Sequence, residues 1–447
     1  MPNLLKLHFG LEGIVGPVLY GLAILGWLIT VFRSPQVGIY ILVPFLPLEN
    51  ARYRLHPYPL GHAFIDVMLL GVGLGLLKQG IPLFPKIRFR TLAIILAVTT
   101  FLSVWVGALL MDLPLPFWFN DIRLNDWKNN IIIPIEIFFF TFAAIRTTKQ
   151  MKILILLTCL LMFGYNRSIY NTITNRDYSS YNEDARIESG NIGQNGLAAM
   201  EAQFAFLAFG LQAFATKRLH RIGYLLLGGF CIYCVTFSFS RGAYLAVLLA
   251  WLVFAIVKSR ILLIPFVLFL ASWQVVVPTA VRERVLMTYD TQNHALDDSA
   301  EARVTVWQDA LEAFQGDPIF GMGYDTYRLL HRVGGYTDTH NLYVKLLVEM
   351  GLVGLFIFLA LFVRAFQAGY ELFRRGTDPF LQGLGLGLAL WMVCAMAANL
   401  FGDRLNYIQI CGPMWAFMAC VVRGLWITDN EESPTEEAVG IPAEVLA

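Results

Sequence analysis

Thirteen apolar stretches, each near the length of a membrane-crossing helix, follow one another along most of this chain. A helix needs about 20 mostly apolar residues to span a bilayer. The stretches lie at 14–32, 35–48, 61–77, 91–111, 129–145, 151–170, 193–215, 222–238, 242–257, 261–277, 340–366, 380–401 and 405–426. The second is short and carries Pro44 and Pro47, so it can be a bent continuation of the first. We therefore predict 12 or 13 transmembrane helices.

Composition excludes a soluble protein. Of the 447 residues, 57% are hydrophobic and only 15% are charged, against about 25% in ordinary soluble domains. A soluble chain of this size lacks the buried volume to hide so many apolar side chains. The fold class predicted is an all-α polytopic membrane protein. Its 33 Lys and Arg balance 32 Asp and Glu, so no basic field indicates nucleic acid as a partner.

Lysines and arginines gather in every second loop, at 78–90, 146–152, 217–221, 258–260 and 364–375. Successive loops of this set are separated by two predicted spans, so they share one side of the membrane. The excess of positive charge predicts that this side is the cytoplasm. The alternate loops, at 112–128, 166–192, 278–339 and 402–404, then lie outside. The acidic residues 427–447 are predicted to form a disordered cytoplasmic tail.

One external segment, 278–339, is long enough to fold, and it separates the transmembrane helices of 1–277 from those of 340–426. Asp298-Ser-Ala-Glu301 is typical of a helix start, and Gly316-Asp-Pro318 ends a helix. Apolar side chains recur between them at helical spacing: Val304, Trp307, Leu311 and Phe314. We predict a helix along the outer membrane surface that buries this stripe and turns Arg303 toward the membrane domain.

A glycine-containing run, Phe320-Gly-Met-Gly-Tyr324, follows that helix. It is either a tight turn that returns the chain to the membrane or a phosphate-binding loop, and the glycine pattern alone does not separate the two. A second short helical run is predicted at 326–332.

Three ionisable residues lie where the outer ends of the spans meet water. Arg241 sits in a very short connector, so it either lines an outward polar cavity or reaches to lipid phosphates. His340 begins a late span and is either a helix cap or, since histidine titrates near neutrality, a general base. Arg303 comes from the external helix. Because arginine binds diphosphate through two parallel hydrogen bonds, the three residues predict displacement of a lipid diphosphate by an alcohol.

Other polar residues are predicted to have smaller roles. Lys345 and Glu349 lie four residues apart on one membrane helix and are expected to neutralise each other. The pair Asp403-Arg404, at an outer turn, is either a local ion pair or part of a cavity wall. Three outer-loop cations can widen the basic pocket, although each can equally be an ordinary loop charge: Arg123, Lys128 and Arg186.

Five motifs between 191 and 356 form a recognisable set. Four are Asn191-Ile-Gly-Gln-Asn195, Ser240-Arg-Gly-Ala243, Ala302-Arg-Val-Thr-Val-Trp307 and Asp317-Pro-Ile-Phe-Gly-Met-Gly-Tyr324. The most specific, at 340–351, has a layout like HNxxLxxLxExG in which Tyr343 and Leu346 are shifted. In these motifs the chain resembles the O-antigen ligase superfamily, which includes O-antigen polymerases and bacterial O-oligosaccharyltransferases, and it is most similar to an O-antigen ligase.

The resemblance implies a GT-C-type glycosyltransferase that acts outside the bacterial inner membrane. Such an enzyme takes its glycan from undecaprenyl diphosphate and is expected to need no nucleotide sugar, metal or other cofactor. Carried over residue by residue, the resemblance implies that the catalytic residues are Arg241, Arg303 and His340. The predicted substrate-binding residues are then Arg123, Lys128, Arg186, Asn191, Asn195, Tyr324 and Asn341.

The leading hypothesis is a multi-pass inner-membrane enzyme, with its active site facing the periplasm, that transfers O-antigen to a sugar hydroxyl of lipid A–core oligosaccharide with inversion. Its expected partners are the undecaprenyl-diphosphate-linked glycan, the lipid A–core acceptor and membrane lipids. An O-antigen polymerase or a protein O-oligosaccharyltransferase stays open, because these enzymes share the motifs. A polysaccharide or lipid transporter is the alternative from another class, although the chain shows no convincing internal repeat of the kind common in transporters.

Overall fold

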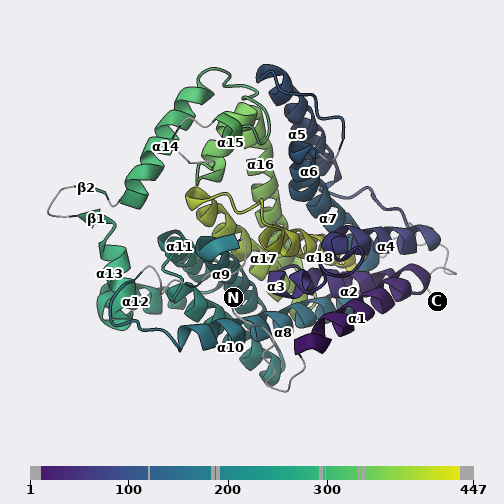
Figure 1. Ribbon diagram of the computed structural model, residues 1–447. Coiled ribbons are helices and arrows are strands. Elements are labelled where there is room, and N and C mark those ends of the chain that lie inside the picture. Colours follow the sequence, from purple (N-terminus) through teal and green to yellow (C-terminus); the bar gives the residue numbers. More distant parts are fainter. Residues whose placement is uncertain are drawn as a thin grey trace.

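The computed structural model describes residues 12–118, 121–182, 187, 192–290, 295–296, 298–330, 333 and 338–432, and these residues are mostly helical (Figure 1). The first half of the chain forms α1 (Glu12–Phe32), α2 (Pro35–Phe45), α3 (Glu49–Tyr53), the 3-10 turn η1 (Gly61–Ala63), α4 (Phe64–Lys78), α5 (Arg90–Leu110), α6 (Ile122–Trp127), the π-helical turn η2 (Lys128–Ile132), α7 (Ile133–Ala144), α8 (Thr148–Ile173) and α9 (Gly193–Gln212). The second half forms α10 (Arg218–Thr236), α11 (Arg241–Lys258), the 3-10 turn η5 (Arg260–Leu262), α12 (Leu263–Val276), α13 (Thr279–Leu286), the short strands β1 (Tyr289–Asp290) and β2 (Ala295–Leu296), α14 (Asp298–Phe314), α15 (Tyr327–Leu330), α16 (Leu342–Arg375), α17 (Pro379–Ala398), the 3-10 turn η6 (Asn399–Phe401) and α18 (Ile408–Glu432).

Each of the thirteen predicted spans coincides with a helix. Nine helices in the described part of the chain are long and apolar enough to cross a membrane: α1, α4 with η1, α5, α8, α10, α11, α16, α17 with η6, and α18. A tenth is counted if α12 and α13, which meet at a bend of 102°, form one broken span. The chain is therefore a multi-pass membrane protein. A total of 12 or 13 spans stays a prediction that depends on whether α2, α7 and α9 also cross the membrane.

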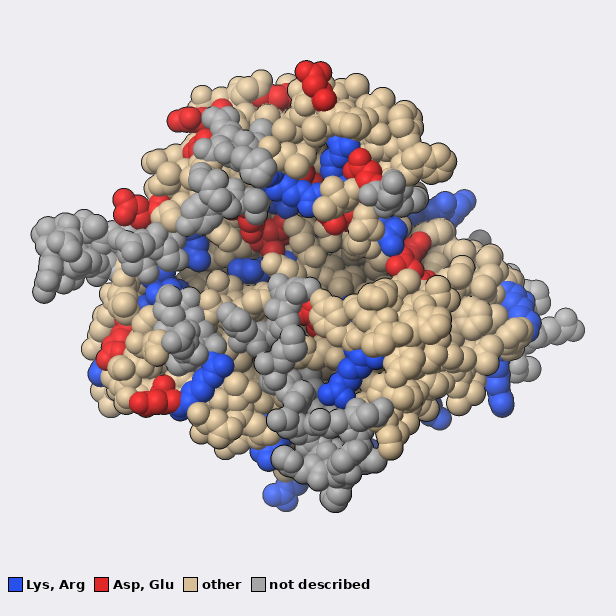
Figure 2. Space-filling model, viewed as in Figure 1, with Lys and Arg blue, Asp and Glu red and all other residues tan. Residues whose placement is uncertain are grey.

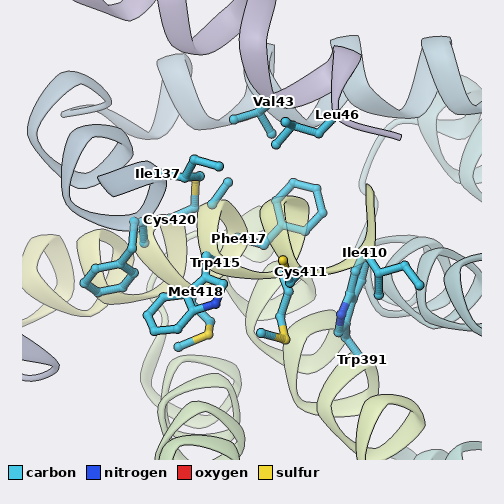
Figure 3. Close-up of a cluster of buried hydrophobic side chains, with 14 of the residues drawn as sticks. Val43, Leu46, Ile137, Trp391, Ile410, Cys411, Trp415, Phe417, Met418 and Cys420 are labelled. Atoms are coloured by element: carbon cyan, nitrogen blue, oxygen red, sulfur yellow. The ribbon is translucent and has the colours of Figure 1, made fainter. Parts of the chain in front are cut away.

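The main hydrophobic core includes side chains of α2, α7, α17 and α18, among them Val43, Ile137, Trp391 and Phe417 (Figure 3). Trp391 of α17 is fully buried, with its ring centre 4.8 Å from that of Phe204 on α9 and 5.5 Å from that of Phe417 on α18. Glycines let these helices approach closely, since a Cβ at Gly383 of α17 would lie 3.0 Å from the Cα of Leu211 on α9.

The basic loops meet at one end of the helix bundle, as their alternation predicts. Three ion pairs join them: Arg88 with Glu371 at 2.5 Å, Lys152 with Asp378 at 2.7 Å, and Arg375 with Asp429 at 2.7 Å. The last pair involves α18, which continues through 427–432. The prediction of a disordered tail is wrong for these six residues, because ion pairing and packing extend the helix past the membrane span. Residues 433–447 lie outside the described residues.

The helix α14 lies at the opposite end of α16 from these loops and packs on its first part (Figure 1). We call this end of the bundle the α14 face. The helix begins and ends where the sequence predicts, but the predicted buried stripe is partly wrong: Val304 and Leu311 are 37% and 41% exposed. The buried side chains are instead Val306, Ala310 and Ala313. Small alanines at the contact let two helices approach more closely than larger side chains would, which decides the face that packs.

Candidate active site

The site begins with a break in α16 at Gly351, where the backbone adopts φ +62°. The break exposes peptide groups, and the glycine-containing loop 318–323 pairs with them. The N–H groups of Met322 and Gly323 donate to the carbonyls of Val348 and Glu349, both at 2.8 Å. In return, N–H groups of α16 donate to loop carbonyls: Leu352 to Pro318 and Val353 to Ile319. The loop amides are therefore used to dock the loop on α16, which favours the structural turn over a phosphate-binding loop.

His340 lies just before α16, with φ +51°, a left-handed conformation that is uncommon for residues other than glycine. Asp338 contacts it twice. One carboxylate oxygen accepts the backbone N–H of His340 at 3.1 Å, and the other lies 3.4 Å from the imidazole Nδ1. The His340 side chain is 42% exposed, so the ring is accessible from outside. A carboxylate at Nδ1 orients the ring and stabilises the imidazolium that forms when histidine takes a proton.

Asp338 is held in its ionised form. Burial raises the pKa of this carboxyl, but the hydrogen bond from His340 and the positive charge of Lys345 lower it more, so the net pKa lies below the usual value. Asp338 is therefore a carboxylate at neutral pH. The pair has the geometry expected of a general base with an orienting acid.

A hydrogen bond ties α14 to the neighbour of His340. The indole N–H of Trp307 donates to the carbonyl of Thr339 at 2.8 Å. Arg303 lies one helical turn before Trp307 and three residues before the buried Val306, so it belongs to the face of α14 that packs on α16. The side chain of Arg303 is half-buried and lies on the side of α14 that faces the rest of the protein, as the sequence predicts.

Arg241 opens α11 at the same end of the molecule. Its guanidinium donates to the hydroxyl of Thr288, after α13, at 3.0 Å. The next residue, Gly242, packs directly on η6, because a Cβ there would lie 2.8 Å from the Cβ of Phe401. The start of α11 therefore neighbours the turn 402–407, which contributes Asp403 to the site.

A cluster of charges fills the space beside Asp338. The ammonium of Lys345 lies 3.0 Å from a carboxylate oxygen of Asp403 and 4.0 Å from one of Asp325. The carboxylate of Glu349 accepts the backbone N–H groups of Asp325 and Tyr327 at 3.0 and 3.1 Å. Mutual neutralisation of Lys345 and Glu349 is only part of the arrangement, because loops distant in sequence bring further partners to both.

These charges line a recess of about 220 Å³ on the α14 face. Its walls are formed by Asp325, Arg328, Asp338, Lys345, Glu349, Asp403, Asn406 and Tyr407. Figure 2 shows lysines, arginines, aspartates and glutamates gathered around the hollowed centre of the view. Burial raises the pKa of Asp325 to about 6, although Lys345 and Arg328 oppose that rise.

Asp403 belongs to this wall, and its carboxylate pairs with Lys345 rather than with the neighbouring Arg404. Asp403 accepts from Lys345 and Asn406, whereas the guanidinium of Arg404 donates to the carbonyl of Phe401 at 3.1 Å. Arg404 is buried, which lowers its pKa, and Asp338 is among the acidic groups close enough to oppose that shift. Of the two interpretations of this turn, the cavity wall is the correct one.

Two of the three predicted outer-loop cations, Arg123 and Lys128, have other partners. Arg123 is 5% exposed and is held by Asp121 and by the carbonyl of Pro114, both at 2.6 Å. Lys128 pairs with Asp66 at 2.7 Å. Arg186 lies outside the described residues.

The other predicted binding residues have mixed positions. Tyr324 is buried, and its backbone N–H donates to the hydroxyl of Ser103 at 2.9 Å. Asn341 caps α16, because its side-chain oxygen accepts the N–H groups of Tyr343 and Val344 at 3.0 and 3.3 Å. Asn195 is half-buried in the first turn of α9, and Asn191 lies outside the described residues.

Three charged residues of the recess are absent from the sequence analysis, namely Asp325, Arg328 and Asp338, and Lys345 and Glu349 were not predicted to belong to the site. Lys345 and Glu349 carried a visible signal, since charges within an apolar helix indicate function by default. The others sit in loops, where charge is ordinary. Among the described residues, no three of His, Cys, Asp and Glu lie close enough together to hold a metal ion.

Replacing Lys345 by Met should lower the free energy of unfolding by about 3–5 kcal/mol, because it leaves a carboxylate without its cation. Asp403 is only 4% exposed and cannot recover full hydration. Thermal unfolding of the detergent-solubilised protein, followed by tryptophan fluorescence, measures the change. Lys149→Met, at an exposed position of α8, is the matched control. Equal stability of the two variants would show that Lys345 is not needed to compensate the buried carboxylate of Asp403.

Comparison with known proteins agrees with this geometry. Residues 224–359 match the family model Wzy_C, described as O-antigen ligase. The matched part contains Arg241, Arg303, Asp338 and His340 as well as Lys345 and Glu349. No curated protein matches the chain. Over this segment, on which the site is built, the chain is similar to the O-antigen ligase family.

Proposed function

We propose that this protein is an O-antigen ligase, which transfers O-antigen polysaccharide from undecaprenyl diphosphate to a sugar hydroxyl of lipid A–core oligosaccharide. The observation that carries the proposal is the His340–Asp338 pair beside the charged recess, within the segment that matches the family. An accessible imidazole oriented by a carboxylate suits removal of a proton from an alcohol.

In the proposed reaction, His340 takes the proton of the acceptor hydroxyl through Nε2 while Asp338 remains at Nδ1. The hydroxyl oxygen forms a bond to the anomeric carbon of the donor sugar, and the bond from that carbon to the diphosphate oxygen breaks. The electron pair leaves with the lipid diphosphate, and attack from the opposite side inverts the carbon. Arg241 and Arg303 bind the diphosphate and stabilise the charge that develops on it.

The membrane orientation proposed follows from the loops. The end joined by the Arg88, Lys152 and Arg375 ion pairs faces the cytoplasm of the inner membrane, because basic loops stay there. The α14 face then opens to the periplasm. Lipid-linked donor and acceptor reach the recess from the outer leaflet.

Deleting the gene tests this function in cells. The expected result is long polymer that remains on the lipid carrier, with none on lipid A. Single repeats on lipid A would indicate a polymerase instead, and loss of glycan from protein would indicate a protein O-oligosaccharyltransferase. Purified protein that moves the lipid across a vesicle membrane without consuming it would favour a transporter.

Arg241→Lys and Arg303→Lys are each expected to lower kcat/KM for the donor by about tenfold or more. Lysine keeps the charge but loses the planar pair of donors that matches a diphosphate. Glycan transfer by the purified full-length protein measures the effect. Arg282→Lys, an exposed position of α13, is the control. Full activity in both active-site variants would argue against diphosphate binding by these arginines.

A further inference from the structure

A second and larger cavity opens on the α14 face, with a volume of about 500 Å³. Most of its wall comes from the N-terminal half of the chain, from α3, η1, α4, α6 and η2. This part lies before the segment that matches the family model. The C-terminal half contributes the region of α15 and the turn before α18. None of the catalytic residues proposed above lines this chamber.

The chamber adjoins the charged recess and shares part of its wall. Four residues line both spaces: Asp325, Arg328, Asn406 and Tyr407. Arg328 lies at the boundary, with its guanidinium 2.9 Å from Asp126 on the chamber side and 2.6 Å from Asp325. A molecule that fills the chamber therefore lies next to the recess that contains Asp338.

Three side-chain amides line the chamber, two of them half-buried and one, Gln409, only 5% exposed. Asn129 and Asn130 lie on the π-helical turn η2, and Gln409 lies at the start of α18. Among the described residues, no side-chain hydrogen bond engages these three amides. Each amide offers two donors and an acceptor, the combination that pairs with sugar hydroxyls. A π turn inside a helix is itself frequent at functional sites.

The charge of the chamber is unsuited to a diphosphate. Its walls carry four carboxylates, Glu49, Asp66, Asp126 and Asp325, against two guanidinium groups, Arg52 and Arg328. Arg328 is already bound to two of the carboxylates. Lys128 pairs with a third carboxylate, Asp66, so the wall has no excess of positive charge to attract an anionic group. Carboxylates and amides, by contrast, readily accept hydrogen bonds from neutral hydroxyls.

We propose that the chamber is the acceptor subsite, which binds a neutral, hydroxyl-rich part of the acceptor glycan and directs one hydroxyl toward His340. This inference rests on the proposed transferase function. It assigns the lipid diphosphate of the donor to the side of Arg241 and Arg303, and the acceptor sugars to the N-terminal half of the chain. Acceptor choice is then determined mainly by residues outside the matched segment.

The test uses Asn130→Ala and Gln409→Ala in the purified full-length protein, with the undecaprenyl-diphosphate-linked glycan as donor and delipidated core oligosaccharide as acceptor. Each variant is expected to raise the acceptor KM about tenfold, the effect of one lost hydrogen bond to a bound group. The donor KM and the slow hydrolysis of the donor by water should stay unchanged. Asn175→Ala, exposed after α8, is the matched control.

Direct binding of the core oligosaccharide, with and without its phosphates, completes the test and needs no transfer reaction. We expect similar affinity for both forms and about tenfold weaker binding by the two chamber variants than by the Asn175→Ala control. The proposed subsite would be refuted by unchanged acceptor binding in both variants. It would also be refuted by a tenfold loss of affinity when the phosphates are removed from the oligosaccharide. If the unaltered protein binds the oligosaccharide through the chamber but never consumes the donor, the transferase proposal fails and the chamber assignment stands.

Discussion

Glycan transfer should fall by a factor of about 100 to 10,000 when His340 is replaced by Ala, the range usual for removal of a general base. The ring is accessible, and Asp338 lies 3.4 Å from its Nδ1, so the opposite nitrogen can face the acceptor hydroxyl. Binding of the donor should be retained, since the proposal assigns the diphosphate to Arg241 and Arg303. The measurement is single-turnover transfer at saturating donor and acceptor.

The control for this substitution is His220→Ala, because His220 is exposed at the start of α10, away from the recess. It should transfer glycan at the normal rate. A near-normal rate in His340→Ala protein would refute the role of general base. In that case the left-handed backbone at His340 would reflect only the geometry of the connection to α16.

The second large effect is on stability and concerns Gly351→Ala. Gly351 has φ +62°, and a Cβ there would collide with the carbonyl group of Ile319. We expect a loss of about 2–5 kcal/mol in the free energy of unfolding, from backbone strain together with overpacking. Transfer activity should fall as well, because the break in α16 docks the loop that carries Asp325 into the recess.

Gly229→Ala provides the comparison for Gly351. Gly229 lies within α10, and a Cβ there would meet no atom within 4 Å. This variant should be neutral or gain up to about 1 kcal/mol, since alanine is the better helix former. Thermal unfolding in detergent measures both proteins. Equal midpoints for the two variants would show that the α16 break tolerates a side chain.

Much of the helical architecture could be predicted, because a membrane helix is a continuous stretch of apolar residues of nearly fixed length, which is visible in the local sequence. The two ends of α14 could also be predicted from local sequence, from Asp298 at its start and from the residues that follow Phe314 at its end. The face of α14 that packs against α16 could not be predicted from the local sequence. Val304 and Leu311 have the spacing of a buried stripe, yet the small Ala310 and Ala313 make the contact. Hydrophobicity alone does not reveal which surface fits its neighbour.

The candidate site likewise contains some residues that the sequence indicated and others that only the structure revealed. Arg241 and His340 stood out because charge and imidazole are conspicuous at the ends of apolar helices, and Arg303 because it lies in the one long external segment. Asp338, Asp325 and Asp403 did not, because a loop aspartate is ordinary until a fold brings it against Lys345 or His340. The partners of Lys345 come from positions 20 residues earlier and 58 residues later in the chain, which no local pattern connects.

The sequence by itself therefore determined a multi-pass helical protein, the grouping of its basic loops and the three residues proposed for catalysis. Each of these depends on the chemistry of a residue and its near neighbours. Only the tertiary structure decided the break at Gly351, the carboxylate at Nδ1 of His340, and the chamber joined to the recess. Those features arise where segments distant in sequence meet, and the free energy of such contacts depends on shape and distance in three dimensions.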